Sequence, residues 1–285
     1  MRRLAAALLL AAAASAHGGA SVLDATGREI RLAQPARRIA TLSPALTEAV
    51  FAAGAGRSVV GVSAWSDYPP EATRLPVVSS SAGADVEAIA RLAPDLVLAW
   101  RDSFRPADAA KLAALGIPVF VDGSRTLADI APLLESIGRL ADVDAAPAAR
   151  RYRETLAALR ARYASRRAVP VFLEISHRPL MTVSGPHFMV EALETCGARS
   201  VFASLPDVAP VIGWEALHAA DPGAIVGAGS AQGEAAFRAA WRERPTLRAV
   251  KAGKLAWVGS SALGRPSPRV VEGIAALCEA IERLR

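Results

Sequence analysis

Short apolar runs rich in β-branched residues alternate along this chain with longer segments whose apolar residues recur at helical spacing. Strands that alternate with helices usually build parallel sheets covered by helices. The pattern therefore predicts an α/β protein with two lobes whose sheets are largely parallel. The predicted strands are residues 39–42, 59–63, 96–100 and 119–121 in the first lobe, and 171–175, 224–227 and 255–258 in the second.

One uninterrupted helix is predicted between the two groups of strands, at residues 145–164. Its apolar stripe runs from Tyr152 to Tyr163, and Pro147 is tolerated because it lies in the first turn. Twenty residues at about 1.5 Å each span roughly 30 Å, so the helix should hold the lobes in one arrangement. The expected division is an N-terminal lobe at 22–142, a rigid linking helix at 143–165 and a C-terminal lobe at 166–285.

Two segments of the chain resemble each other. Residues 48–59 and 191–201 agree at seven of eleven aligned positions when Gly56 is skipped. A second match begins at Glu87 and Glu215, each of which is followed seven residues later by a proline. The spacing between the copies is far longer than a solenoid repeat. We therefore expect the lobes to be copies of one unit, with the functional site between them.

The N-terminus has the pattern of an export signal. Arg2 and Arg3 precede an apolar run at 4–14, and small residues follow up to Ala16. The run is shorter than the roughly 20 residues that a membrane-spanning helix needs, and no later stretch approaches that length. We expect residues 1–16 to be a signal peptide, cleaved after Ala16 or shortly beyond, and the mature protein to be exported and soluble.

Composition and charge add little to this picture. The chain has 52% hydrophobic and 21% charged residues, which is typical of a globular protein. Loss of Arg2 and Arg3 with the signal would lower the net charge of +6 to about +4. Arginines concentrate on the linking helix, but without the aromatic residues that nucleic-acid grooves interleave with them. We expect a monomer that binds no nucleic acid.

Only two cysteines are present, Cys196 and Cys278, and neither lies in a metal-ligand spacing. In an oxidising compartment they most simply form a disulfide, and two buried thiols are the alternative. A bridge would close a loop of about 83 residues and stabilise the fold by roughly 4 kcal/mol at most. No cysteine follows the apolar run of the signal, so the mature protein is not expected to be membrane-anchored.

Ligands of open parallel sheets gather beyond the carboxyl ends of the strands. Two of the five tryptophans, Trp65 and Trp100, lie at such strand ends, which suits stacking on a large flat ligand. Packing in the lobe core is the alternative for both. The candidate residues that follow predicted strands are Ser43, Trp65, Trp100, Asp122, His177, residues 227–229, Ser260 and Ser261.

The sequence carries few signs of catalysis. It has no Walker-type glycine loop, no Gly-x-Ser-x-Gly motif and no His-Glu-x-x-His motif. Its four histidines are too scattered to predict a metal site built from the protein alone. We therefore expect no enzyme and no cofactor. An exported hydrolase with Ser184 or Asp122 as nucleophile and His187 as base is the distant alternative.

Glu87 and Glu215 are predicted to occupy the second position of a helix in each lobe, after Asp85 and Gly213. The helix dipole favours an acidic residue there by about 0.3 to 1 kcal/mol, which is a sufficient structural reason for either glutamate alone. Their matching places in both lobes indicate a pair of docking contacts for a basic partner.

Four motifs, TLSPAxTE at 41–48, GVS leading to SDYPP at 61–70, PDLV with AWR at 94–101, and SPR at 267–269, carry a family resemblance. They resemble the periplasmic cobalamin-binding proteins that deliver the vitamin to an ABC importer. The resemblance covers most of the mature chain and is densest between residues 38 and 101. It implies a helical-backbone (class III) substrate-binding fold, a periplasmic location, a bridge between Cys196 and Cys278, and permease docking through Glu87 and Glu215.

The resemblance also implies a set of ligand-binding positions, at which this sequence departs from the family. Trp65 stands where the family uses an aromatic residue, and Trp100 matches a family tryptophan. Ser81 and Ala209 replace tryptophans that flank the corrin. The remaining candidates are Ser261 in place of an acidic residue, Ser176 and His177 in place of an aromatic–glycine pair, and Arg265.

Cobalamin or a related corrinoid is the implied transported ligand, and the permease of an ABC importer, with its ATPase, is the implied partner. His177 is a possible axial ligand to the cobalt or iron that the transported molecule carries. Haem or a ferric siderophore is the alternative within the same architecture. For a catecholate siderophore, the candidate cationic residues are Arg101, Arg178 and Arg265.

Overall fold

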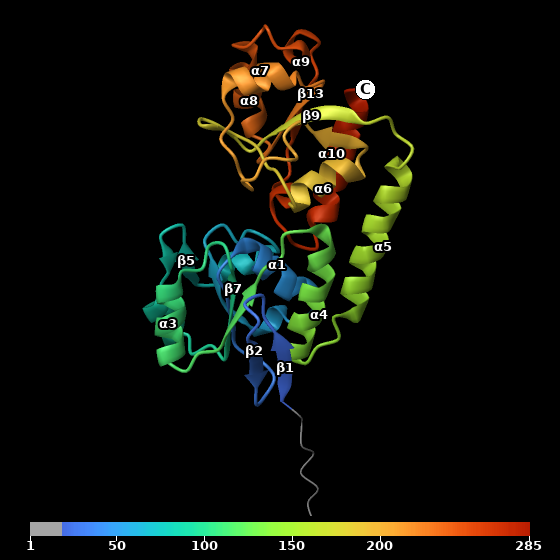
Figure 1. Ribbon diagram of the computed structural model, residues 1–285. Coiled ribbons are helices and arrows are strands. Elements are labelled where there is room, and N and C mark those ends of the chain that lie inside the picture. The colour runs from blue at the N-terminus through green and yellow to red at the C-terminus, as the bar shows by residue number, and fades with distance from the viewer. Residues whose placement is uncertain (1–18) are drawn as a thin grey trace, which may run out of the picture.

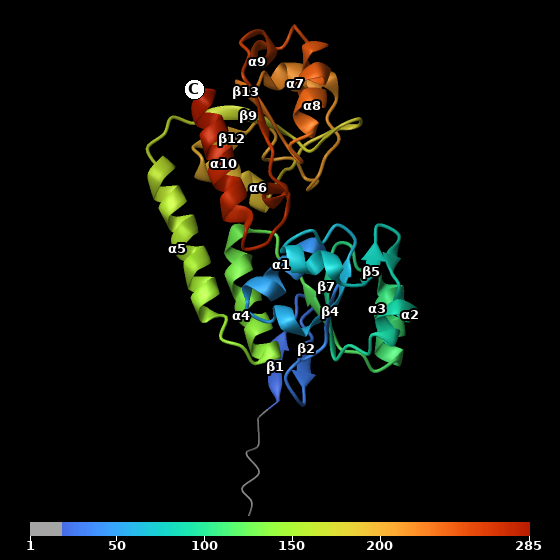
Figure 2. The same cartoon turned by 180° about the vertical axis from the view of Figure 1, so that it is seen from behind.

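The computed structural model describes residues 19–285. These residues form two α/β lobes joined by the helix α5 (Ala146–Tyr163), which runs along one side of the molecule (Figure 1). The C-terminal helix α10 (Val270–Arg283) lies in the C-terminal lobe and ends on the same side as α5 (Figure 2). The fold class expected from the sequence is confirmed. The predicted signal peptide at 1–16 lies outside the described residues.

The N-terminal lobe is built around a six-stranded sheet of order β6-β5-β4-β3-β7-β8, which is parallel except for β6. Its central strands are buried on both faces, as apolar strands in a parallel sheet must be. The strands are β3 (Ile39–Thr41), β4 (Val59–Ser63), β5 (Val77–Ser80), β6 (Gly83–Ala84), β7 (Leu96–Trp100) and β8 (Val119–Asp122). The helices are α1 (Pro44–Ala52), α2 (Val86–Arg91), α3 (Pro106–Ala114) and α4 (Ile130–Ala141).

The C-terminal lobe holds a four-stranded, fully parallel sheet of order β12-β9-β13-β14. The strands are β9 (Val169–Glu174), β12 (Ala198–Ser200), β13 (Ala224–Ala228) and β14 (Leu255–Val258), with a small hairpin of β10 (Ser176–His177) and β11 (Leu180–Met181). The helices that precede α10 are α6 (Phe188–Thr195), α7 (Trp214–Ala220), α8 (Gly233–Arg242) and α9 (Arg248–Lys251).

All seven predicted strands exist, and each boundary lies within two residues of its prediction. The short strands β5, β6, β10, β11 and β12 and the N-terminal hairpin of β1 (Ala20–Leu23) and β2 (Glu29–Leu32) were not predicted. In β1 and β2 buried residues alternate with exposed ones over four positions each, which is too short a run to stand out.

The linking helix α5 was predicted within one residue at each end, with Pro147 in its first turn. It covers about 27 Å at the usual rise per residue. Tyr152 and Tyr163 are buried, and the Tyr152 hydroxyl donates a hydrogen bond of 2.8 Å to the carbonyl oxygen of Leu127. One continuous cluster of buried apolar side chains extends from the N-terminal lobe through α5 into the C-terminal lobe. The shared core favours a fixed arrangement of the lobes.

The repeated glutamate of the first copy, Glu48 in α1, is buried against the opposite lobe, with a side chain only 2% exposed. Its Oε1 accepts hydrogen bonds from Nη1 of Arg265 at 2.7 Å and from Nη2 of Arg269 at 2.9 Å. Its Oε2 accepts one from the hydroxyl of Ser267 at 2.5 Å. All three donors belong to the C-terminal lobe. We call Glu48, Arg265, Ser267 and Arg269 the inter-lobe ion cluster.

The repeated glutamate of the second copy, Glu191 in α6, makes the reciprocal contacts. Its Oε2 accepts a hydrogen bond from the backbone N–H of Leu127 in the N-terminal lobe at 3.0 Å. The same oxygen lies 3.7 Å from Nη2 of Arg160 on α5. Each copy of the sequence repeat therefore reaches across to the other half of the molecule, which explains why the glutamate recurs in two otherwise divergent lobes.

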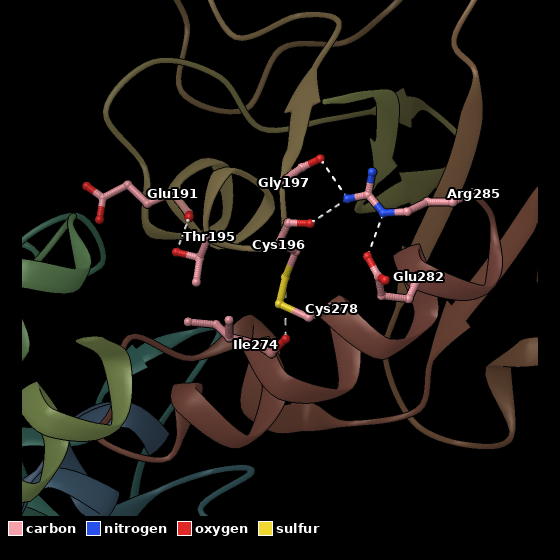
Figure 3. The surroundings of a disulfide bond; sticks show 8 residues. All are labelled: Glu191, Thr195, Cys196, Gly197, Ile274, Cys278, Glu282 and Arg285. Atoms are coloured by element: carbon pink, nitrogen blue, oxygen red, sulfur yellow. Dashed lines mark hydrogen bonds and ion pairs between the residues drawn. A yellow bond between two sulfur atoms is a disulfide. The ribbon is translucent and has the colours of Figure 1, made fainter. Parts of the chain in front are cut away.

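The disulfide between Cys196 and Cys278 is present and fully buried. Figure 3 shows that it joins the end of α6 to α10, with Arg285 beside it. The Arg285 guanidinium donates to the carbonyl oxygens of Cys196 and Gly197, both at 3.0 Å. The bridge and Arg285 together tie the C-terminal helix to the remainder of its lobe.

Candidate functional site

A cavity of about 570 Å³ lies between the two lobes. It is lined from both sides by residues that follow strands or begin helices, as expected for open parallel sheets. We call it the inter-lobe cavity. Its N-terminal wall consists of Ser43, Pro44, Ala45, Trp65, Trp100 and Asp122. Its C-terminal wall includes Glu174, Ile175, Val183, His187, Phe188, Met189, Ala209, Gly229, Ser260, Ser261 and Arg265.

The N-terminal wall places two tryptophans on the cavity. Trp65 follows β4 and is 82% exposed at the rim, whereas Trp100 closes β7 and is half-buried. The indole N–H of Trp100 is buried and has no hydrogen-bond partner within residues 19–285. Ser43 caps α1 by accepting a hydrogen bond from the backbone N–H of Leu46 at 3.3 Å. The first turn of α1 therefore faces the cavity.

The C-terminal wall repeats this arrangement with α6. His187 caps the helix, and its Nδ1 accepts a hydrogen bond from the backbone N–H of Met189 at 3.2 Å. Burial and, to a smaller extent, the charge of Arg125 lower the pKa of His187 to about 4. The ring is therefore neutral at neutral pH. Because Nδ1 is the acceptor, Nε2 carries the proton.

The electrostatics of the inter-lobe cavity are set by two carboxyl groups and one arginine. Burial raises the pKa of Asp122, although its carboxylate accepts hydrogen bonds from Ser124. Burial also raises the pKa of Glu174. Of the residues that the structure describes, Arg265 is the one lysine or arginine on the cavity wall, and it is ion-paired with Glu48 and Asp67. The wall thus offers no cation without a carboxylate partner.

Five of the predicted ligand-binding residues line the cavity together: Trp65, Trp100, Ala209, Ser261 and Arg265. The strand-end rule, by which residues that directly follow predicted strands are candidates for the site, also identified Ser43, Asp122, Gly229 and Ser260. Ser81 and Ser176 are not among the lining residues. Ser81 is exposed between β5 and β6, and Ser176 is half-buried in the β10–β11 hairpin.

His177 does not line the cavity either. Its ring packs edge-on against Trp214 and Trp241, with centroids 5.8 and 5.4 Å away. Its Nδ1 lies 3.3 Å from Oε2 of Glu174, which also accepts a hydrogen bond of 2.6 Å from the indole of Trp241. The hairpin turns the imidazole into this aromatic cluster, and His187 occupies the cavity wall instead.

The N-terminal turn of α6, with Phe188 and Met189, was missed by the strand-end rule because it begins a helix after a loop. A signal was present in the sequence. The repeat that pairs Glu48 with Glu191 also pairs the start of α1 with residues around His187. The counterpart of Ser43 in the second copy of the repeat therefore lies in this turn, which the sequence could have identified.

The two candidate docking glutamates are exposed and lie in the first turns of α2 and α7. The side chain of Asp85 caps α2 by accepting a hydrogen bond from the N–H of Ala88 at 2.9 Å. Figure 2 shows α2 on the side of the N-terminal lobe opposite α5, and α7 at the far end of the C-terminal lobe. Each lobe thus exposes one of the two candidate docking glutamates, and neither glutamate lines the inter-lobe cavity.

The geometry around Ser184 does not form a hydrolase site. The Ser184 hydroxyl is buried and donates a hydrogen bond of 3.0 Å to the carbonyl oxygen of Leu205. His187, the proposed base, uses Nδ1 to cap α6. Between residues 19 and 285 we find neither a group of three potential metal-ligating side chains nor a helix long and apolar enough to cross a membrane.

Comparisons with known proteins agree with this geometry. The sequence profile of the family described as "Periplasmic binding protein" matches residues 39–260. The vitamin B12-binding protein of Vibrio parahaemolyticus is 33% identical over 256 residues, which cover 88% of this chain and 92% of that protein.

Two solved structures are also similar. The periplasmic vitamin B12 binding protein BtuF of Vibrio cholerae superposes with a TM-score of 0.79 at 31% identity, covering 88% of this chain and 98% of that one. A periplasmic haem-binding protein from Pseudomonas aeruginosa has a TM-score of 0.75 at 26% identity, with 86% and 92% of the two chains covered. With its two lobes, its linking helix and the extent of these matches, the chain belongs to the periplasmic binding protein family.

Proposed function

We propose that this protein captures cobalamin or a related corrinoid in the inter-lobe cavity and delivers it to the permease of an ABC importer. The observation that carries the proposal is the cavity itself, in which Trp65 and Trp100 lie on the N-terminal wall, at the carboxyl ends of two strands of one parallel sheet. The vitamin B12-binding relatives support the same ligand. Flat aromatic rings suit a macrocycle because they provide a large apolar contact area.

Affinity in this arrangement arises from preformed walls. The shared apolar core, the linking helix and the inter-lobe ion cluster hold the lobes together. A ligand that enters a preformed cavity loses its own freedom, but the protein has little conformational entropy left to lose. A large ring compound is therefore bound without a closing movement of the lobes.

The charges on the wall favour a corrinoid over haem. A corrin ring carries neutral carboxamide groups, whereas haem carries propionate carboxylates. The wall holds Asp122 and Glu174, and Arg265 is already paired, so a carboxylate would be desolvated without a free cation. Haem iron also needs an axial side chain. His177 lies outside the cavity, and Nε2 of His187 carries the ring proton, so neither is poised to supply one.

The direct test is ligand capture by the exported form of the protein. Cyanocobalamin, cobinamide and haemin are each incubated with it, and the coloured ligand that elutes with protein from a desalting column is measured. We expect both corrinoids to travel with the protein and haemin to separate from it. Trp65→Ala should weaken cyanocobalamin binding about fivefold, the equivalent of roughly 1 kcal/mol of stacking. Leu115→Ala, at an exposed apolar position outside the cavity, is the control. Haemin retention without corrinoid retention would reverse the assignment.

Delivery to the importer uses Glu87 and Glu215 in this proposal. One exposed carboxylate at the start of a helix in each lobe complements a pair of basic groups on a permease. The double variant Glu87→Arg with Glu215→Arg should abolish uptake, because two attractive contacts become repulsive. Ligand affinity should stay unchanged, since neither residue lines the cavity.

The matched control for docking is Glu154→Arg with Glu279→Arg. It makes the same change in net charge at exposed positions on α5 and α10. Corrinoid uptake by cells and corrinoid affinity of the purified protein are measured for both double variants. Equal uptake in the two would contradict docking through Glu87 and Glu215, and lost affinity would place these carboxylates in the ligand site.

Two finer features complete the proposal. The protein acts in the periplasm after removal of a signal peptide, which the export pattern at the N-terminus supports. It binds and releases its ligand without chemical conversion, as the arrangement around Ser184 and His187 supports. Recovery of unaltered cyanocobalamin from the protein after incubation is the expected result.

A further inference from the structure

Trp65 holds an unusual backbone conformation at the rim of the inter-lobe cavity. Its φ is +67°, in the left-handed region that residues other than glycine seldom adopt, and its side chain is 82% exposed. A conformation of this kind persists only when the surrounding contacts impose it. Burial of the indole cannot impose it here, so hydrogen bonds to the segment must do so.

The N-terminal lobe supplies part of these bonds. The hydroxyl of Ser66 lies 3.0 Å from that of Ser63 and 3.0 Å from that of Thr47, in a buried network beneath the segment. The backbone N–H of Asp67 donates to the carbonyl oxygen of Trp65 at 2.9 Å. These contacts fix the base of the turn but leave the exposed indole without support.

The remaining bonds come from the opposite lobe, through Arg265. Its Nη2 donates to the carbonyl oxygen of Trp65 at 3.0 Å, and its Nη1 donates to Oδ1 of Asp67 at 2.6 Å. Nη1 also donates to Oε1 of Glu48 at 2.7 Å, which holds the guanidinium in place. The Arg265 side chain is only 15% exposed. One side chain of the C-terminal lobe therefore donates hydrogen bonds to both ends of the Trp65–Asp67 turn.

We propose that Arg265 is a positioning residue, which holds Trp65 over the mouth of the cavity from the opposite lobe. The aromatic wall then has its ligand-binding geometry only at the lobe spacing seen here. Any movement that separates the lobes withdraws Arg265 and frees the turn that carries Trp65. The expected effect of Arg265 on ligand binding rests on the proposed function. The expected effect of Arg265 on the Trp65–Asp67 turn does not depend on it.

The guanidinium geometry is what makes Arg265 suitable. Its planar fork reaches a carbonyl oxygen and two carboxylates at once, whereas an ammonium is a compact point charge. Arg265→Lys therefore keeps the charge near Glu48 and Asp67 but cannot maintain all three contacts. Arg269→Lys is the matched control, because Arg269 also binds Glu48 but makes no hydrogen bond to the Trp65–Asp67 turn. Its contact with the neighbouring Tyr68 is a cation over the ring at 3.9 Å, which a lysine also provides.

The first experiment needs no ligand. Hydrogen–deuterium exchange of the peptide that covers residues 63–69 is compared among the wild-type exported protein, Arg265→Lys and Arg269→Lys. We expect at least tenfold faster exchange in this peptide for Arg265→Lys and wild-type exchange for Arg269→Lys. Circular dichroism and exchange in the strands β7 and β9 verify that both variants are folded. Unchanged exchange at 63–69 in Arg265→Lys would overturn the proposal.

The second experiment is a double-mutant cycle on cyanocobalamin affinity. Arg265→Lys should weaken binding three- to fivefold in the wild-type background and by less than 1.5-fold in the Trp65→Ala background. An equal loss in both backgrounds would show that Arg265 contacts the ligand itself, and would reject the positioning role. If the wild-type protein binds no corrinoid, the proposed function fails, whereas the exchange experiment still decides the role of Arg265.

Discussion

Glu48→Ala is expected to lower the free energy of unfolding by about 3 to 5 kcal/mol, the usual cost of removing one partner from a buried ion pair. The Glu48 side chain is 2% exposed and accepts hydrogen bonds from Arg265, Ser267 and Arg269. Alanine would leave two guanidinium groups, 15% and 17% exposed, without their shared carboxylate. Both lobes contribute to this cluster, so the loss should also loosen their contact.

Urea unfolding monitored by circular dichroism measures the effect of Glu48→Ala. Glu71→Ala is the control, because Glu71 is an exposed glutamate of the same lobe, and it should change stability by no more than about 0.5 kcal/mol. Glu48→Gln, which keeps the shape but not the charge, should fall between the two. Equal unfolding midpoints for Glu48→Ala and Glu71→Ala would show that the ion cluster contributes nothing net.

Loss of the disulfide is the second large expected effect. Replacing both Cys196 and Cys278 by alanine should lower stability by about 2 to 4 kcal/mol, because the bridge closes a long loop and so restricts the unfolded chain. The bridge spans 82 residues and joins the end of α6 to α10. For a protein of this size, the loss corresponds to a fall in Tm of roughly 4 to 8 °C.

Calorimetry of the alanine double variant, and of the wild-type protein after reduction under mild denaturant, measures this effect. Reduction separates the loss of the bridge from the loss of side-chain volume, since both sulfur atoms remain. Both samples should melt earlier than the oxidised wild-type protein, and cyanocobalamin affinity at 20 °C should be unchanged because neither cysteine lines the cavity. A reduced protein that melts at the wild-type temperature would contradict a stabilising role.

Much of the fold was predictable because it depends on local patterns. The strands β4, β7 and β14 were predicted with the same bounds that the structure shows, since each is a short apolar run next to polar or turn residues. The linking helix followed from its stripe and from the place of Pro147. The cavity tryptophans were found because parallel strands direct their carboxyl ends to a common edge.

The candidate site was predicted only in part, because separation along the chain does not indicate which loops lie side by side in the fold. His177 follows a predicted strand and His187 follows a loop, so the local pattern favoured the histidine that does not line the cavity. The β10–β11 hairpin directs His177 into a cluster with Trp214 and Trp241, whereas the start of α6 brings His187 to the cavity. Packing between residues far apart in the chain therefore determines which of the two histidines lines the cavity.

By itself, the sequence determined the alternation of strands and helices and the stiff helix between the lobes, since each is encoded in hydrophobic periodicity within a short window. It also determined the duplication of the lobes, through the two pairs of matching segments. Only the tertiary structure decided that Arg265 meets Glu48 and the Trp65–Asp67 turn, residues 198 to 217 positions away. Such contacts depend on how the two lobes are oriented. That orientation results from a core shared by the whole molecule, and no local pattern of residues contains it.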